Sequence, residues 1–170
     1  MTQSSGPLQR WGMRPGWWRS RHGEGYVAAQ MLLLLLLVAI PPDHILQVWL
    51  PQPVGVVVGG AAICAGLLLV VAGSRRLGRY LSPLPYPSPG STLIDQGIYT
   101  WIRHPLYSGL VLGGLGLSLW QGSLRQLLLT LGLFLVLDRK AGVEERFLCE
   151  TFPEYPQYRE RTVRLVPFLY

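Results

Sequence analysis

Two short groups of charged residues in the second half of the chain could act together on a small molecule. The first group is Arg103-His104, which is followed directly by Pro105 and a long apolar run. Because proline fits the first helical position, the pattern predicts a helix that begins at Pro105, with both cations at its positive end. Free N–H groups, a guanidinium and an imidazole at one point could bind a carboxylate or a phosphate. A membrane-edge anchor and a capping residue would use the same two side chains, and the local sequence leaves both interpretations open.

The second group is the acidic pair Glu144-Glu145, which follows the last apolar run. If the last two apolar runs form a helical hairpin, this pair should face Arg103-His104, and together they suit a zwitterion such as an α-amino acid head group. A solvated face of an interfacial helix is the simpler alternative for the two glutamates. The sequence contains no common nucleotide-binding fingerprint, no plausible Ser/His/Asp set and no Cys/His cluster with metal-ligand spacing, so no metal site is predicted.

The elements that must position these groups are apolar runs of the kind that cross membranes. Hydrophobic residues make up 49% of the 170-residue chain and charged residues only 14%, and the apolar residues are clustered. We therefore predict an all-α integral membrane protein with about four transmembrane helices. The expected spans are 26–40, 54–73, 106–120 and 124–138. The first is short, because its fifteen residues would extend only about 22 Å into a hydrocarbon layer of roughly 30 Å.

The segments around the spans differ from them in composition. Residues 1–24 are predicted to form a flexible basic tail, and the proline-rich stretch 80–96 to form an ordered or extended loop with a functional role. The glycines of the second and third spans should allow neighbouring helices to approach closely. After the fourth span the chain becomes charged, so we expect that helix to leave the membrane and continue as a C-terminal amphipathic segment.

The positive charges predict how the chain is oriented. With four spans, fourteen of the fifteen lysines and arginines fall on the face that carries both termini, and Arg125 is the exception. The positive-inside rule then predicts a multi-pass protein with both termini in the cytoplasm. Because the arginines flank apolar runs, membrane lipids explain the net charge of +6 better than a nucleic acid partner does.

Several of these residues together match the pattern of a known family. The matching elements are Gly97-x-Tyr99, Arg103-His104-Pro105-x-Tyr107-x-Gly109, Glu144-Glu145-x-x-Leu148-x-x-x-Phe152, and Tyr155 with Tyr158. This pattern resembles that of the isoprenylcysteine carboxyl methyltransferases and of the broader group of membrane phospholipid methyltransferases. The resemblance covers about residues 83–167, which would be the catalytic core of a membrane methyltransferase domain at 25–170.

The resemblance implies an enzyme that binds S-adenosylmethionine at a cytoplasmic site without a Rossmann domain. The cofactor-binding residues it implies are Ser91, Thr92, Leu93, Ile94, Tyr99, His104, Pro105, Leu106, Tyr107 and a glutamate of the acidic pair, Glu144 by spacing, with Glu145 beside it. Arg103 and Arg139 are the candidate catalytic residues, with Lys140 as an alternative to Arg139 for the substrate contact. The chain departs from the family pattern at Ser91, where relatives often have histidine, and at Arg139, which lies one residue further from the acidic pair.

The methyl acceptor is predicted only by class. The expected function is methyl transfer at the membrane interface to a lipophilic small molecule or lipidated substrate, similar to an isoprenylcysteine carboxylate. Few titratable groups are placed to act as a base, which favours a nucleophile that needs none. A lipid amine or thiol acceptor, a reductase with a related helical core, and a non-enzymatic membrane scaffold subunit remain as alternatives. The oligomeric state is not predicted.

Overall fold

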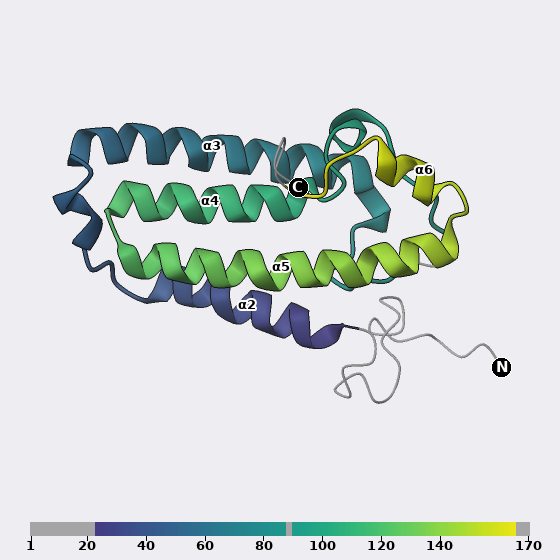
Figure 1. Cartoon of the computed structure of the whole chain (residues 1–170), viewed down its shortest axis with the longest axis horizontal. Helices are drawn as coiled ribbons and strands as arrows, with labels where there is room; N and C mark the ends of the chain where they lie inside the picture. Colours follow the sequence, from purple (N-terminus) through teal and green to yellow (C-terminus); the bar gives the residue numbers. More distant parts are fainter. Residues whose placement is uncertain (1–22, 88–89, 166–170) are drawn as a thin grey trace.

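A computed structural model describes residues 23–87 and 90–165, which form an all-helical arrangement (Figure 1). The α-helices are α2 (Glu24–Ala39), α3 (Gln52–Leu77), α4 (Pro105–Gln121), α5 (Leu124–Thr151) and α6 (Tyr155–Glu160). Short 3-10 helices are η2 (Ile45–Val48), η3 (Gly78–Tyr80) and η4 (Gly97–Thr100). The predicted tail at 1–24 lies outside the described residues except for Gly23 and Glu24, and the prediction was wrong for Glu24, which begins α2.

The four long helices lie side by side in the order α3, α4, α5, α2 (Figure 1). Every predicted span is helical, and α4 begins at Pro105 as predicted. The predicted continuation of the fourth span is also confirmed, because α5 is a single helix of 28 residues that ends just before Pro153. By length and apolar composition, one helix of the described chain can cross a membrane: Gln52–Tyr80, with a mean hydropathy of 2.6.

Glycines bring α3 and α4 into backbone contact. A Cβ atom on Gly66 would lie 2.6 Å from the carbonyl oxygen of Gly109, and one on Gly59 would lie 2.5 Å from that of Gly116. Real Cβ atoms do not approach an oxygen so closely, so only glycine fits at these positions. The prediction that glycines allow close helix packing is confirmed for this pair.

The last described residues lie beside the start of α4. Residues 162–165, which we call the C-terminal strap, run beside residues 101–104 and form a short parallel bridge between Ile102 and Val163. The backbone N–H of Arg103 donates to the Val163 carbonyl at 2.9 Å, and that of Val163 donates to the Trp101 carbonyl at 3.0 Å. No pattern in the sequence predicts this pairing. The pairing fixes the position of the residues just before α4, which include Arg103 and His104.

Candidate active site

One cavity lies at the end of the helix bundle where α3 ends, α4 begins and α5 passes alongside. About 890 Å³ of space between its walls is not occupied by protein atoms, and part of this space is open solvent. Ten of the thirteen site residues predicted from the sequence line it. They are Ser91, Thr92, Leu93, Ile94, Tyr99, Arg103, His104, Leu106, Tyr107 and Glu144. Residues from three separate segments of the chain therefore share one wall.

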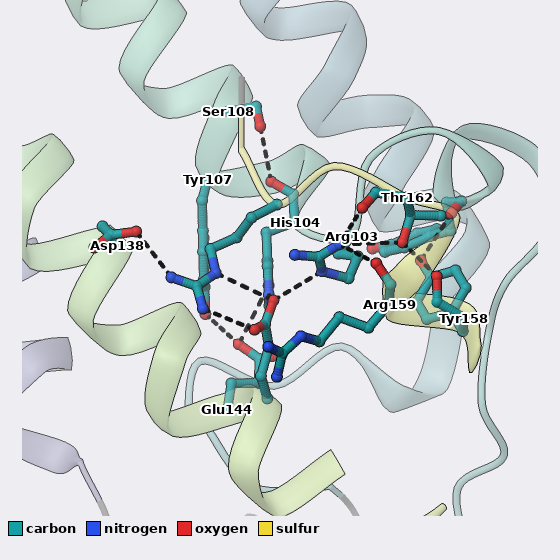
Figure 2. A network of polar contacts seen from close by, with 12 residues as sticks. Arg103, His104, Tyr107, Ser108, Asp138, Glu144, Tyr158, Arg159 and Thr162 are labelled. Carbon is teal, nitrogen blue, oxygen red and sulfur yellow. Dashed lines mark hydrogen bonds and ion pairs between the residues drawn. The ribbon is translucent and has the colours of Figure 1, made fainter. Parts of the chain in front are cut away.

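His104, Tyr107 and Glu144 form the polar part of this wall (Figure 2). The Tyr107 hydroxyl donates to Glu144 Oε2 at 2.7 Å. The His104 and Tyr107 rings stack with centroids 5.2 Å apart, and His104 Nδ1 lies 3.8 Å from Glu144 Oε2. Glu144 Oε1 makes no hydrogen bond to any residue in the described ranges. The first turn of α4 thus holds the Glu144 carboxylate in place through one oxygen and leaves the other for a ligand.

Glu145 has a different environment from its neighbour. It is buried, lies off the cavity lining, and accepts from Arg103 Nε at 2.8 Å and from Arg164 Nη2 at 2.9 Å, with His104 Nε2 at 3.3 Å. Burial alone would raise the pKa of Glu145, but the hydrogen bonds from His104, Arg164 and Arg103 outweigh burial and hold that pKa well below the ordinary value of 4.5. Of the acidic pair, Glu145 joins the segments of the fold and Glu144 faces the cavity.

Arg103 is also largely engaged within the protein (Figure 2). Besides Glu145, its Nη1 donates to the carbonyl oxygen of Arg159 at 2.9 Å and to that of Thr162. Its Nη2 has no hydrogen-bond partner among residues 23–87 and 90–165. The local sequence left open whether Arg103 would bind a ligand anion or serve as a membrane-edge anchor. In the fold, Glu145 neutralises most of the Arg103 charge, and the Nη2 edge of the guanidinium remains available to a ligand.

The remaining predicted residues lie off the cavity. Pro105 is buried at the start of α4, and Arg139 is exposed on α5. Lys140, the alternative to Arg139, is 1% exposed; its Nζ donates to Gln30 Oε1 on α2 at 2.8 Å and lies 5.0 Å from the centroid of the Tyr107 ring. Neither Arg139 nor Lys140 therefore lines this cavity.

Sequence reasoning missed the contribution of the C-terminal residues. Tyr155 and Tyr158 line the cavity, yet the motif gave them no individual role. The Tyr158 hydroxyl donates to the Tyr99 carbonyl at 2.7 Å, which ties α6 to η4. Arg164 of the strap links Glu145 to Asp138, its Nη1 donating to Asp138 Oδ1 at 3.2 Å. The sequence does not indicate which partner a single arginine in a basic tail will have. The tyrosine spacing in the family motif, in contrast, could have placed Tyr155 and Tyr158 at the site.

Within the described ranges, no group of three or more His, Cys, Asp or Glu side chains is arranged to hold a metal ion. The two cysteines, Cys64 and Cys149, are both free and exposed.

Comparison with known proteins relates this chain to a family of methyltransferases. The family model described as phospholipid methyltransferase matches residues 54–155. The cobalt-zinc-cadmium resistance protein CzcN of Cupriavidus metallidurans is 39% identical over 80 residues, 46% of this chain and 37% of that protein. The protein-S-isoprenylcysteine O-methyltransferase of Schizosaccharomyces pombe is 32% identical over 79 residues, 45% of this chain and 34% of that protein. The chain thus spans about a third of each relative. Since the family model covers more than half of it, the chain belongs to the phospholipid methyltransferase family, which includes isoprenylcysteine carboxyl methyltransferases.

Proposed function

We propose that the protein is an S-adenosylmethionine-dependent methyltransferase that acts at the membrane interface on a lipophilic acceptor. The observation that carries this proposal is the cavity, whose wall contains ten residues that the family resemblance assigned to such a site. Membership of the phospholipid methyltransferase family supports the same reaction class. A scaffold subunit would have no need for a cavity lined by these residues.

The polar groups on the cavity wall fit S-adenosylmethionine. This molecule carries a cationic sulfonium and an amino acid zwitterion, and when bound it supplies the activated methyl group. Glu144 Oε1 is free to accept from the cationic part of the ligand, and Arg103 Nη2 is free to donate to an anionic part. The buried hydroxyl of Ser91 also lacks a partner among the described residues, although Ser91 stands where relatives often have histidine.

The protein's contribution to the reaction is alignment more than proton transfer. Methyl transfer is an in-line displacement, so holding donor and nucleophile in one geometry accounts for much of the rate. Tyr107 and His104 fix the Glu144 carboxylate from one side. Glu145 fixes Arg103 from behind the cavity wall. Arg103 is the better positioned of the two candidate catalytic residues, because Arg139 is exposed and off the cavity.

The acceptor should be a lipophilic molecule with a nucleophile that needs no dedicated base, such as an isoprenylcysteine-like carboxylate. Much of the cavity lining is apolar, which suits an acyl or prenyl chain: Leu77, Leu81, Leu84, Leu148 and Phe152. The Schizosaccharomyces pombe relative is a methyltransferase for isoprenylcysteine by name. A lipid amine or a lipid thiol is the alternative acceptor within the same family.

We further propose that α2, α3, α4 and α5 all cross the membrane, with the cavity and both termini on the cytoplasmic side. Apolar side chains remain exposed on all four helices, including Leu35 at 63%, Leu68 at 69%, Trp120 at 46% and Leu135 at 53%, and a lipid environment would cover them. Arg75 and Arg76 end α3 near the cavity, which agrees with the positive-inside rule.

A titration with S-adenosylmethionine tests the proposed function. The detergent-solubilised wild type should bind it, and Glu144→Gln should weaken binding by about 10-fold or more, since a charge-assisted hydrogen bond contributes about 1.5–3 kcal/mol. Glu150→Gln is the matched control, because Glu150 is exposed on the same helix and off the cavity. A wild type that does not bind would overturn the function, and a Glu144→Gln variant that binds normally would overturn the site.

Membranes that contain the active protein should also transfer a radiolabelled methyl group from S-adenosylmethionine to an extractable lipid or a lipidated protein. The chemical class of the labelled product distinguishes a carboxyl acceptor from an amine or thiol acceptor, because only a methyl ester is released as methanol by mild base.

A further inference from the structure

Tyr155 is the most deeply buried aromatic residue on the cavity wall. It is the first residue of α6, its side chain is 1% exposed, and it packs with Phe152 and Tyr158. Its hydroxyl nevertheless has no hydrogen-bond partner within the described part of the chain. Leaving a buried donor unsatisfied costs about 1–3 kcal/mol, so a hydroxyl in such a position calls for a physical reason.

Tyr158, one turn further along α6, provides an internal comparison. It lines the same cavity and is 3% exposed, but its hydroxyl donates to the Tyr99 carbonyl at 2.7 Å. A purely structural tyrosine on this helix therefore does find a backbone partner. A phenylalanine at position 155 would pack in the same way without an unsatisfied hydroxyl. Packing alone therefore does not explain why this residue is a tyrosine.

The neighbours of Tyr155 on the cavity wall indicate which ligand the hydroxyl would meet. The ionisable side chains of that wall other than tyrosine are Arg103, His104 and Glu144, and the hydroxyl of Ser91 is a second unsatisfied group in the same cavity. This polar part is the one that the proposed function gives to the methyl donor, while the leucine-rich part suits the acceptor.

We propose that the Tyr155 hydroxyl donates a hydrogen bond to S-adenosylmethionine, so that α6, and not only the segments before and within α4 and α5, forms part of the cofactor site. The inference rests on the proposed function. Burial raises the pKa of Tyr155, so the hydroxyl keeps its proton and can donate throughout the neutral range.

The Tyr155→Phe variant distinguishes a ligand-binding role from a structural one. The two roles predict opposite effects on the melting temperature and on the affinity for S-adenosylmethionine. If the hydroxyl serves the ligand, the ligand-free variant should melt at or above the wild-type temperature, since an unsatisfied buried group has been removed. Its dissociation constant for S-adenosylmethionine should rise by about 2- to 10-fold, the value of one hydrogen bond. Tyr158→Phe should instead lower the melting temperature of the ligand-free protein, because it loses the bond to Tyr99.

Calorimetric titration and thermal melting of the full chain in detergent provide both readouts. Tyr26→Phe, on α2 and away from the cavity lining, is the control for loss of a tyrosine hydroxyl and should bind as the wild type does. Wild-type affinity in Tyr155→Phe would overturn this inference and leave the proposed function standing, as would a lower melting temperature with unchanged affinity. Failure of the wild type itself to bind would overturn the proposed function and the inference with it.

Discussion

The α3–α4 pair and the polar cluster at the end of α5 are held together in opposite ways. Between α3 and α4, glycines such as Gly66 and Gly109 bring two backbones together without any charge at the contact. Around Glu145, the contact is made by charged side chains from three segments: the start of α4, α5 and the strap. The first contact depends on the absence of side chains and the second on ion pairs between them. The helix pair supplies a rigid frame, and the cluster fixes the cavity wall to that frame.

The largest expected effect in this comparison comes from Glu145→Gln. Removing the charge leaves Arg103 and Arg164 without their shared carboxylate, and breaking a buried ion pair costs about 3 kcal/mol or more. The free energy of unfolding in mixed detergent micelles should fall by about that amount. Asp95→Asn is the control, because the Asp95–Arg161 pair is 38% and 64% exposed and should contribute less than about 1 kcal/mol. Equal losses in both variants would contradict the importance given to the cluster.

Acid should reproduce part of this effect in the wild type. Because the pKa of Glu145 is lowered in the folded protein, its contribution to stability is complete above pH 4.5 and is lost as the pH falls toward the folded-state pKa. As the pH is lowered from 5, the Glu145→Gln variant should lose less stability than the wild type does. A variant with the same pH dependence as the wild type would show that Glu145 is not the titrating group.

The next effect in size comes from Gly66→Ala at the helix pair. The new Cβ would lie 2.6 Å from the Gly109 carbonyl oxygen, so α3 and α4 must separate, and overpacking of this kind costs about 1–3 kcal/mol. Gly113→Ala is the matched control in α4, where a Cβ meets nothing within 4 Å and helix propensity improves. Thermal melting should show a loss for the first variant and no loss for the second. A neutral Gly66→Ala would contradict the close contact between these backbones.

The same two regions differ in how well the sequence predicts them. Pro105 predicted the start of α4, and the glycines predicted the close packing of α3 and α4. Both features were predictable because each depends on the chemistry of individual residues. The family pattern predicts that Tyr99, His104 and Glu144 share one site, and all three line the cavity. The pairing of the strap with residues 101–104 was not predictable, because a backbone ladder between distant segments leaves no residue signature.

The sequence predicted that Glu144-Glu145 would face Arg103-His104, as it does, but it did not predict which of these side chains pair or that Lys140 contacts Gln30. Lys140 and Gln30 are 110 residues apart, and Arg103 and Glu145 are 42 residues apart. A charge pattern predicts that partners exist without saying which ones pair. The sequence therefore could not tell that Glu145 satisfies Arg103 while its neighbour Glu144 remains available at the cavity. That division follows from the helical turn, which points adjacent side chains in directions about 100° apart.

Ultraviolet cross-linking of radiolabelled S-adenosylmethionine, followed by tryptic mapping, tests the central claim most directly. Trypsin separates the relevant segments, since cleavage at arginines gives peptides 22–75, 80–103 and 147–159. If the cavity binds the methyl donor, label should appear in 80–103 and 147–159, which carry Tyr99 and Tyr155, and excess S-adenosylhomocysteine should abolish it. Competable label found chiefly in 22–75, away from the cavity, would contradict the assignment of this cavity as the cofactor site.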